Sequence, residues 1–291
     1  MNNKTFQKLY NPYSTECNPI EKSRIMPGFL LGQQGSLAGI DAAFRAGVSD
    51  IEIVLPHHDQ KMDGSIIKSA SKRIFEESSS FKPSEMIRDL GEYLKIYRFS
   101  TNRNHEISYL HVMSYFQGIF QGRHKPQKIQ NFVSACYKSR ISNLIIPDIP
   151  DDPDGDLLQN LASESRISIT KMITPKNNKI MIPTVKYSDV AYIIPKRGQK
   201  TGKKVYLDNS TYTVLEQVSN RLPGRIKLIG FGITPESVNR LQSLGYTPVF
   251  CSPMVAELSR VRESLATDDP QEIYNQYYKA SRNLINQYSN I

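Results

Sequence analysis

The stretch DIEIVLPHHDQKMDGSIIKSASKRIFEESSSF, residues 50–81, contains the unit from which the fold follows. Residues 50–56 are a short run rich in branched apolar side chains, which is typical of a strand covered on both faces. A polar loop comes next, and residues 64–81 then have the pattern of a helix. The stretch therefore predicts a strand, a loop and a helix in succession.

The same succession recurs along the chain. The predicted strands are residues 28–32, 50–56, 107–116, 143–148, 167–173, 189–195, 226–231 and 247–252. A short helix is expected after Pro175, and two helices end the chain, the last with an apolar stripe through Tyr277 and Tyr288. Strands that alternate with helices predict a parallel sheet covered by helices. Periodicity alone does not separate a closed (β/α)8 barrel from an open doubly wound sheet.

Length and composition narrow the class of protein. The 291 residues suit one barrel of about 250 residues, so residues 26–291 are expected to form a single domain and residues 1–25 an extension that packs on it. The net charge is +9, but acidic residues are interspersed with the basic ones, which favours general solubility over nucleic-acid binding. The sequence contains no run of about 18 apolar residues, so no membrane-spanning helix is predicted.

The termini and cysteines bear on the compartment. The N-terminal residues have no apolar core of a signal peptide, so we expect a cytoplasmic protein. Cys17, Cys136 and Cys251 lie far apart and lack CxxC spacing, which disfavours a disulfide framework or a zinc site. His57 and His58 invite a metal interpretation. Adjacent side chains on an extended segment tend to point apart, however, so no metal site is expected.

Two carboxylates are candidates for catalysis. Glu52 lies inside the apolar strand of residues 50–56. A carboxylate there is unfavourable unless it is paired or faces a polar cavity, and burial would raise its pKa into the range of a general acid or base. A strand-edge Glu that faces solvent or a Lys explains the pattern equally well. Asp63 follows in a loop where a barrel carries functional groups, although Asp63-Gly64 is also a common turn pair.

Two turns near the C-terminus have the residues of an anion site. Gly230-Phe231-Gly232 and Cys251-Ser252 each follow an apolar strand and open a helix. Backbone N–H groups at helix N-termini bind anions, and the loops after the last two strands of a barrel often hold phosphate. The basic loop of residues 196–202 is typical either of a mobile lid over an anion or of a solvated surface loop.

In this order and spacing, the segments resemble the tryptophan synthase alpha-subunit family. The resemblance runs from about Met26 to the C-terminus, and the segments that carry it are residues 51–64, 142–150, 192–202, 230–233 and 252. It implies a (β/α)8 barrel, the TIM barrel, that cleaves indole-3-glycerol phosphate to indole and glyceraldehyde 3-phosphate without a cofactor. It also implies a tryptophan synthase beta subunit as a partner.

The resemblance further implies residue roles. Glu52 would be the general acid/base at the glycerol hydroxyl and the indole ring carbon, and Asp63 would hold the indole N–H. The implied indole-pocket residues are Tyr192, Phe231 and Thr201, and the implied phosphate donors are Gly202, Gly232 and Ser252.

The sequence also departs from the family pattern. Gly32-Gln33-Gln34 replaces a Gly-Asp-Pro, Gly28 replaces a bulky aromatic residue, and Cys251 replaces a glycine, with a side chain close to the expected phosphate. Some of the departures lie where the family docks its beta subunit. Two other interpretations therefore stay open: a related barrel enzyme for a different phosphorylated substrate, and a non-catalytic barrel that serves as a binding or interaction module.

Overall fold

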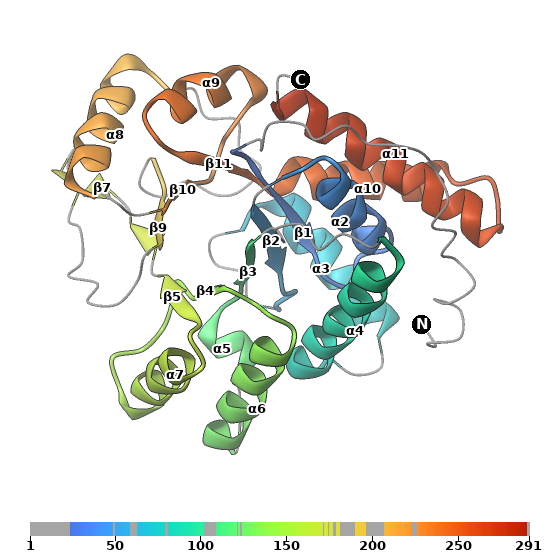
Figure 1. The fold of residues 1–291 in the computed structure, drawn as a ribbon, viewed down its shortest axis with the longest axis horizontal. Helices are drawn as coiled ribbons and strands as arrows, with labels where there is room; N and C mark the ends of the chain where they lie inside the picture. The colour runs from blue at the N-terminus through green and yellow to red at the C-terminus, as the bar shows by residue number, and fades with distance from the viewer. Residues whose placement is uncertain are drawn as a thin grey trace.

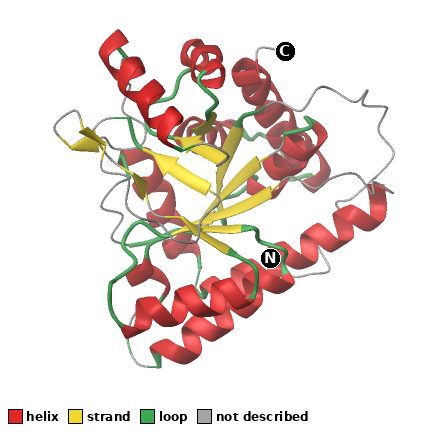
Figure 2. Cartoon of the chain, turned by 60° about the vertical axis from the view of Figure 1, so that its left-hand side comes forward, coloured by secondary structure: helices red, strands yellow, loops and turns green. Residues whose placement is uncertain are grey.

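The computed structural model describes residues 24–289 with gaps. The gaps are residues 49, 59–62, 79–80, 102–108, 121, 123, 171, 174, 177–178, 181–189, 196–206 and 223–225. Within the described residues, parallel strands form a central ring and helices surround it (Figures 1 and 2). None of the described helices is long and apolar enough to cross a membrane.

The strands are arranged in the ring largely in chain order. They are β1 Met26–Leu30, β2 Asp50–Val54, β3 Tyr109–Met113, β4 Asn143–Ile145, β5 Ser168–Thr170, β6 Met172–Ile173, β9 Val190–Ile193, β10 Ile226–Ile229 and β11 Thr247–Phe250. Their order is β5-β4-β3-β2-β1-β11-β10-β9-β6. The strands at the two ends of this order, β5 and β6, both come from one predicted strand, residues 167–173. Thr170 Oγ1 of β5 donates to the carbonyl of Val190 in β9 at 3.3 Å, across the join between β5 and β9. The parallel sheet is therefore a barrel and not an open doubly wound sheet.

The helices cover the outside of this barrel. They are α2 Ser36–Arg45, α3 Ser65–Glu77, α4 Pro83–Thr101, α5 Phe116–Ile119, α6 Lys125–Lys138, α7 Pro153–Glu164, α8 Asn209–Arg221, α9 Pro235–Ser243, α10 Ser252–Ser264 and α11 Pro270–Ser289. The predicted apolar stripe of α11 is confirmed, because Tyr277 and Tyr288 are buried. Tyr277 packs on Gly35 at the start of α2, where a Cβ would lie 2.2 Å from its ring. This contact fixes the C-terminal helix against the first one.

Three predicted elements differ from the structure. The helix expected after Pro175 is wrong: Pro175–Lys176 (β7) pairs antiparallel with Lys179–Ile180 (β8). Proline lacks a backbone N–H and is tolerated at such a sheet edge. The strand expected over residues 107–116 ends at Met113, and α5 follows it. The strand expected over residues 167–173 consists of two pieces, because β5 pairs with β4 and β6 pairs with β9.

A chain of buried polar side chains connects four neighbouring strands inside the barrel. Asp50 Oδ1 lies 2.8 Å from His111 Nε2, and His111 Nδ1 lies 3.2 Å from Asn143 Nδ2. Thr170 Oγ1 donates to Asn143 Oδ1 at 2.9 Å and so extends the chain to β5. Buried polar groups are unfavourable without partners, so these bonds favour the observed order of strands β2, β3, β4 and β5.

Candidate active site

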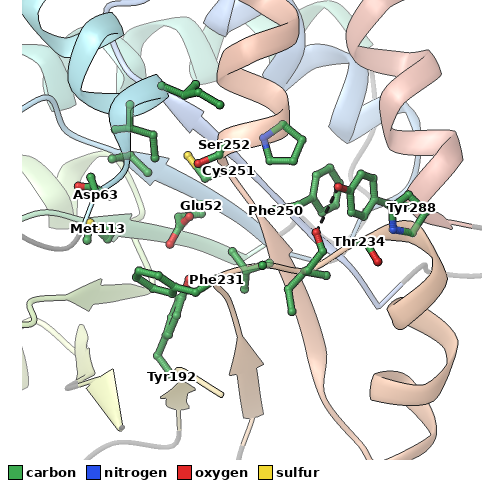
Figure 3. Close-up of a pocket in the computed structure, with 18 of the residues that line it drawn as sticks. Glu52, Asp63, Met113, Tyr192, Phe231, Thr234, Phe250, Cys251, Ser252 and Tyr288 are labelled. Carbon is green, nitrogen blue, oxygen red and sulfur yellow. Dashed lines mark hydrogen bonds between the residues drawn. The ribbon is translucent and has the colours of Figure 1, made fainter. Parts of the chain in front are cut away.

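A cavity of about 310 Å³ lies at the carboxyl ends of the barrel strands. Its walls come from the ends of β2, β9, β10 and β11 and the segments that follow them (Figure 3). The predicted site residues that line it are Glu52, Asp63, Tyr192, Phe231, Gly232 and Ser252. The structure therefore brings these residues, which span 200 positions of sequence, to one place. Thr201 and Gly202, which were also predicted, lie outside the described residues.

Glu52 lies in the middle of β2, and its side chain enters the cavity (Figure 3). Its residue surface is only 3% exposed, so the interpretation of a Glu that faces solvent is wrong. Burial raises the pKa of this carboxyl group from 4.5 to about 8, and the negative charge of Asp63 adds to the effect. Near neutral pH the group is thus largely protonated and can both give and take a proton.

Asp63 lies just before α3 and is also buried, which does not fit an ordinary surface turn. The Tyr115 hydroxyl donates a hydrogen bond to its Oδ2 at 3.2 Å. Tyr115 was not predicted as a site residue. A signal was available in the sequence, since Tyr115 lies near the carboxyl end of the predicted strand of residues 107–116, where barrels carry functional groups. The hydroxyl fixes the direction in which the carboxylate of Asp63 points.

Tyr192 and Phe231 form an aromatic wall of the cavity. Their ring centroids are 6.3 Å apart and the planes are 84° apart, an edge-to-face arrangement. Burial, followed by the charge of Glu52, raises the pKa of Tyr192 well above its usual value, so its hydroxyl stays neutral. Phe231 has a φ of 69°, which is uncommon for a non-glycine residue and is often found at functional sites. This backbone conformation holds the Phe231 ring against the cavity.

The part of the cavity wall that includes Ser252 and Gly232 has the features of an anion site. Ser252 is the first residue of α10, and its Oγ is buried without a hydrogen-bond partner among the described residues. Gly232 lies nearby in the wall with a φ of 81°, which favours glycine. A helix N-terminus attracts anions, and a buried hydroxyl without a partner is unfavourable until something accepts from it. Both observations indicate a ligand with anionic oxygens.

Residues 25–286 match the family model for the tryptophan synthase alpha chain. The chain belongs to the tryptophan synthase alpha chain family. Enzymes of this family cleave indole-3-glycerol phosphate. A tryptophan synthase alpha chain of Bacillus pumilus is 24% identical over 272 residues, which are 91% of this chain and 89% of the relative. One of Clostridium kluyveri is 26% identical over 198 residues, 67% and 68% of the two chains.

Solved structures give the same fold. A chain in the tryptophan synthase α2β2 complex of Pyrococcus furiosus superimposes with a TM-score of 0.67 and is 18% identical. The match covers 94% of the present chain and all of that chain. This match shows the fold of a (β/α)8 barrel.

Two residues in or just after β1, Gly28 and Gln33, contact neighbouring segments closely. Gln33 Nε2 donates to the Val255 carbonyl at 2.9 Å and to Ser259 Oγ at 3.1 Å, so the segment after β1 is connected to α10. Gly28 lies between Glu52 and Cys251, and a Cβ at this position would overlap both. A bulky aromatic side chain would therefore not fit at position 28 of this chain.

The histidines near the site have separate surroundings. The buried ring of His57 lies 5.4 Å from the ring of Tyr115, whereas His58 is exposed and stacks on Phe75 of α3 at 3.7 Å. Among the described residues, no group of three or more His, Cys, Asp or Glu side chains is placed to hold a metal ion.

Proposed function

We propose that this chain cleaves indole-3-glycerol phosphate to indole and glyceraldehyde 3-phosphate by a retro-aldol reaction. One observation carries the proposal: Glu52 and Asp63 are buried in the same cavity that is lined by Ser252 at the start of α10, whose hydroxyl has no hydrogen-bond partner among the described residues. The proton-transfer groups and the anion site are thus placed to act on one phosphorylated molecule. Membership of the alpha family supports the same substrate.

The reaction needs one proton to move in each direction. Glu52 starts protonated, because its pKa is raised to about 8, and gives its proton to the indole ring carbon that carries the glycerol chain. Positive charge then develops on the ring, and the carboxylate of Asp63 accepts a hydrogen bond from the ring N–H. Glu52, now ionised, takes the proton of the neighbouring glycerol hydroxyl. The carbon–carbon bond breaks, its electrons return to the ring, and the alcohol carbon becomes an aldehyde.

Other residues orient the substrate in this proposal. Tyr192 and Phe231 would pack against the indole ring, because their rings form the apolar wall next to Glu52. Ser252 and Gly232 would donate to the phosphate, and Gly202, which lies outside the described residues, is a further donor expected from the sequence alone. Such a set holds the reacting carbon near Glu52, and orientation of this kind lowers the barrier substantially.

The test is indole release from indole-3-glycerol phosphate by the purified full-length chain. Glu52→Gln keeps the shape of the side chain and removes its acid, so the rate should fall by about 10²–10⁴-fold. Glu76→Gln is the matched control, because Glu76 is an exposed residue of α3 and its side chain is 62% exposed. Equal rates for the wild-type chain and Glu52→Gln, from folded protein, would refute the proposal.

A beta subunit forms a further arm of the same assay. The Pyrococcus furiosus structure is of an α2β2 complex whose subunits activate each other. We propose that a beta subunit also binds this chain and raises the rate, while the need for Glu52 remains. Addition of a tryptophan synthase beta subunit should then increase indole release by the wild-type chain and leave Glu52→Gln inactive. A rate unchanged by a saturating beta subunit would remove the partner from the proposal without affecting the chemistry.

A further inference from the structure

Gly28, Glu52 and Cys251 lie side by side in the barrel wall, on three neighbouring segments. Gly28 of β1 is the register partner of Glu52 on β2. On its other side, Pro27 pairs with Phe250 of β11, so Gly28 lies beside Cys251. Gly28 therefore separates the proposed acid from a cysteine that also lines the cavity. Figure 3 shows Cys251 and Glu52 on the same side of the cavity.

The space above Gly28 is filled by its two neighbours. A Cβ on residue 28 would lie 2.6 Å from Cys251 Cβ and 2.8 Å from Glu52 Oε2. Both distances are shorter than real Cβ contacts, so no side chain fits there without movement of the neighbours. One methyl group would overlap both side chains, which means that Cys251 and Glu52 face each other across the gap.

We propose that Cys251 is a positioning residue for Glu52: its side chain fills the gap above Gly28, fixes the carboxyl group from behind and keeps water away from it. The inference rests on the proposed function, because it gives this chain its own way to hold the acid. Gly28 is the necessary partner, since only a residue without a side chain leaves room for the cysteine.

The chemistry of the thiol fits a space-filling role. Cys251 is buried, and burial, followed by the charges of Glu52 and Asp63, raises its pKa well above the usual value. The side chain thus stays a neutral thiol, which packs like a small apolar group. A thiolate nucleophile is disfavoured by the same carboxyl groups. Cys251 acts on the reaction through Glu52 and forms no bond to the substrate.

The surroundings of Glu52 show what loss of the thiol would change. Among the described residues, the ionisable groups around its carboxyl group are Asp63 after β2, Tyr192 on β9 and Cys251 after β11. Burial is the largest cause of its raised pKa. Cys251→Gly would open a space of about the volume of one water molecule, roughly 30 Å³. Water in that space would hydrate the carboxylate and lower the pKa of Glu52.

The experiment is a cycle of four proteins: wild type, Gly28→Ala, Cys251→Gly and the double variant. Gly28→Ala should lose indole-releasing activity by about 10²-fold, because its methyl group displaces Glu52. The double variant should recover at least about tenfold of that loss, since removal of the Cys251 side chain relieves one of the two overlaps. Cys251→Gly alone should shift the basic limb of the pH profile of kcat/KM down by about one unit. Cys251→Ala, which keeps the Cβ, should shift it less.

Two results would overturn the inference. The first is equal impairment of Gly28→Ala with Cys or with Gly at position 251, and the second is a pH profile of Cys251→Gly that matches the wild type. A readout without turnover separates this inference from the proposed function. Infrared difference spectra between the wild type and Glu52→Gln report the protonation of Glu52 directly, and the same subtraction is made in the Cys251→Gly background. An unchanged pH midpoint for the titration of Glu52 in the Cys251→Gly background would refute the positioning role, even if the chain releases no indole. A lowered midpoint would support it.

Discussion

Glu52→Gln should make the protein more stable, and the gain should depend on pH. Burial raises the pKa of Glu52 from 4.5 to about 8 in the folded chain. Below pH 4.5 the folded and unfolded chains both hold the proton, and the carboxyl group costs the fold nothing through ionisation. As the pH rises from 4.5 to about 8, the unfolded chain releases the proton and the folded chain keeps it. Each pH unit in this window then destabilises the folded state by about 1.4 kcal/mol.

The expected gain follows from this window. At pH 7 the penalty carried by Glu52 is about 3 kcal/mol, and a glutamine of the same shape does not carry it. Urea unfolding, followed by circular dichroism at pH 5, 6 and 7, should show the free energy of unfolding of Glu52→Gln rise relative to the wild type across the series. Glu76→Gln serves as the control, because its side chain is exposed and its replacement should change little. A variant that is less stable than the wild type at pH 7, or a gain that does not change with pH, would refute the reasoning.

Three further predictions concern single contacts. Ser252→Ala should leave the free energy of unfolding within about 0.5 kcal/mol of the wild type, because the Ser252 Oγ has no partner among the described residues. The same substitution should raise the Kd for glycerol 3-phosphate about 10–100-fold, and unchanged affinity measured by calorimetry would contradict the anion site. Tyr115→Phe removes the hydrogen bond to Asp63 Oδ2 and should lower kcat about tenfold with little change in KM, and an unaltered kcat in steady-state assays would argue against this contact. Thr170→Val loses the bonds to Asn143 and to the Val190 carbonyl and should reduce the free energy of unfolding by about 1–3 kcal/mol, so an equal urea midpoint would speak against the join at β5.

The local pattern of the sequence was sufficient for the strands that carry the site. The apolar run around Glu52 predicts a buried strand, because exposure of its apolar side chains to water is unfavourable. Asp63 lies in the loop that follows the carboxyl end of that strand. The division of the predicted strand, residues 167–173, into β5 and β6 was not predictable, because the two pieces pair with different neighbours, β4 and β9.

Contacts between residues on different strands could be identified only from the structure. Gly28 was predicted only as the loss of an aromatic side chain, and Cys251 only as an obstruction near phosphate. Their pairing around Glu52 depends on the register between β11, β1 and β2, which no local pattern specifies. The polar chain from Asp50 to Thr170 was missed for the same reason, since each member is a single polar residue in a different strand.

The boundary between β5, which pairs with β4, and β6, which pairs with β9, divides the chain into two half-barrels, and it also divides the candidate site. Glu52 and Asp63 come from the half that precedes this boundary, whereas Tyr192, Phe231, Gly232 and Ser252 come from the half that follows it. In the proposed function, one half thus carries the proton-transfer groups and the other carries the surfaces for the ring and the phosphate. Neither half contains all of these residues, so the proposed catalysis would require the whole ring, whereas affinity for a phosphate ester would depend mainly on the second half.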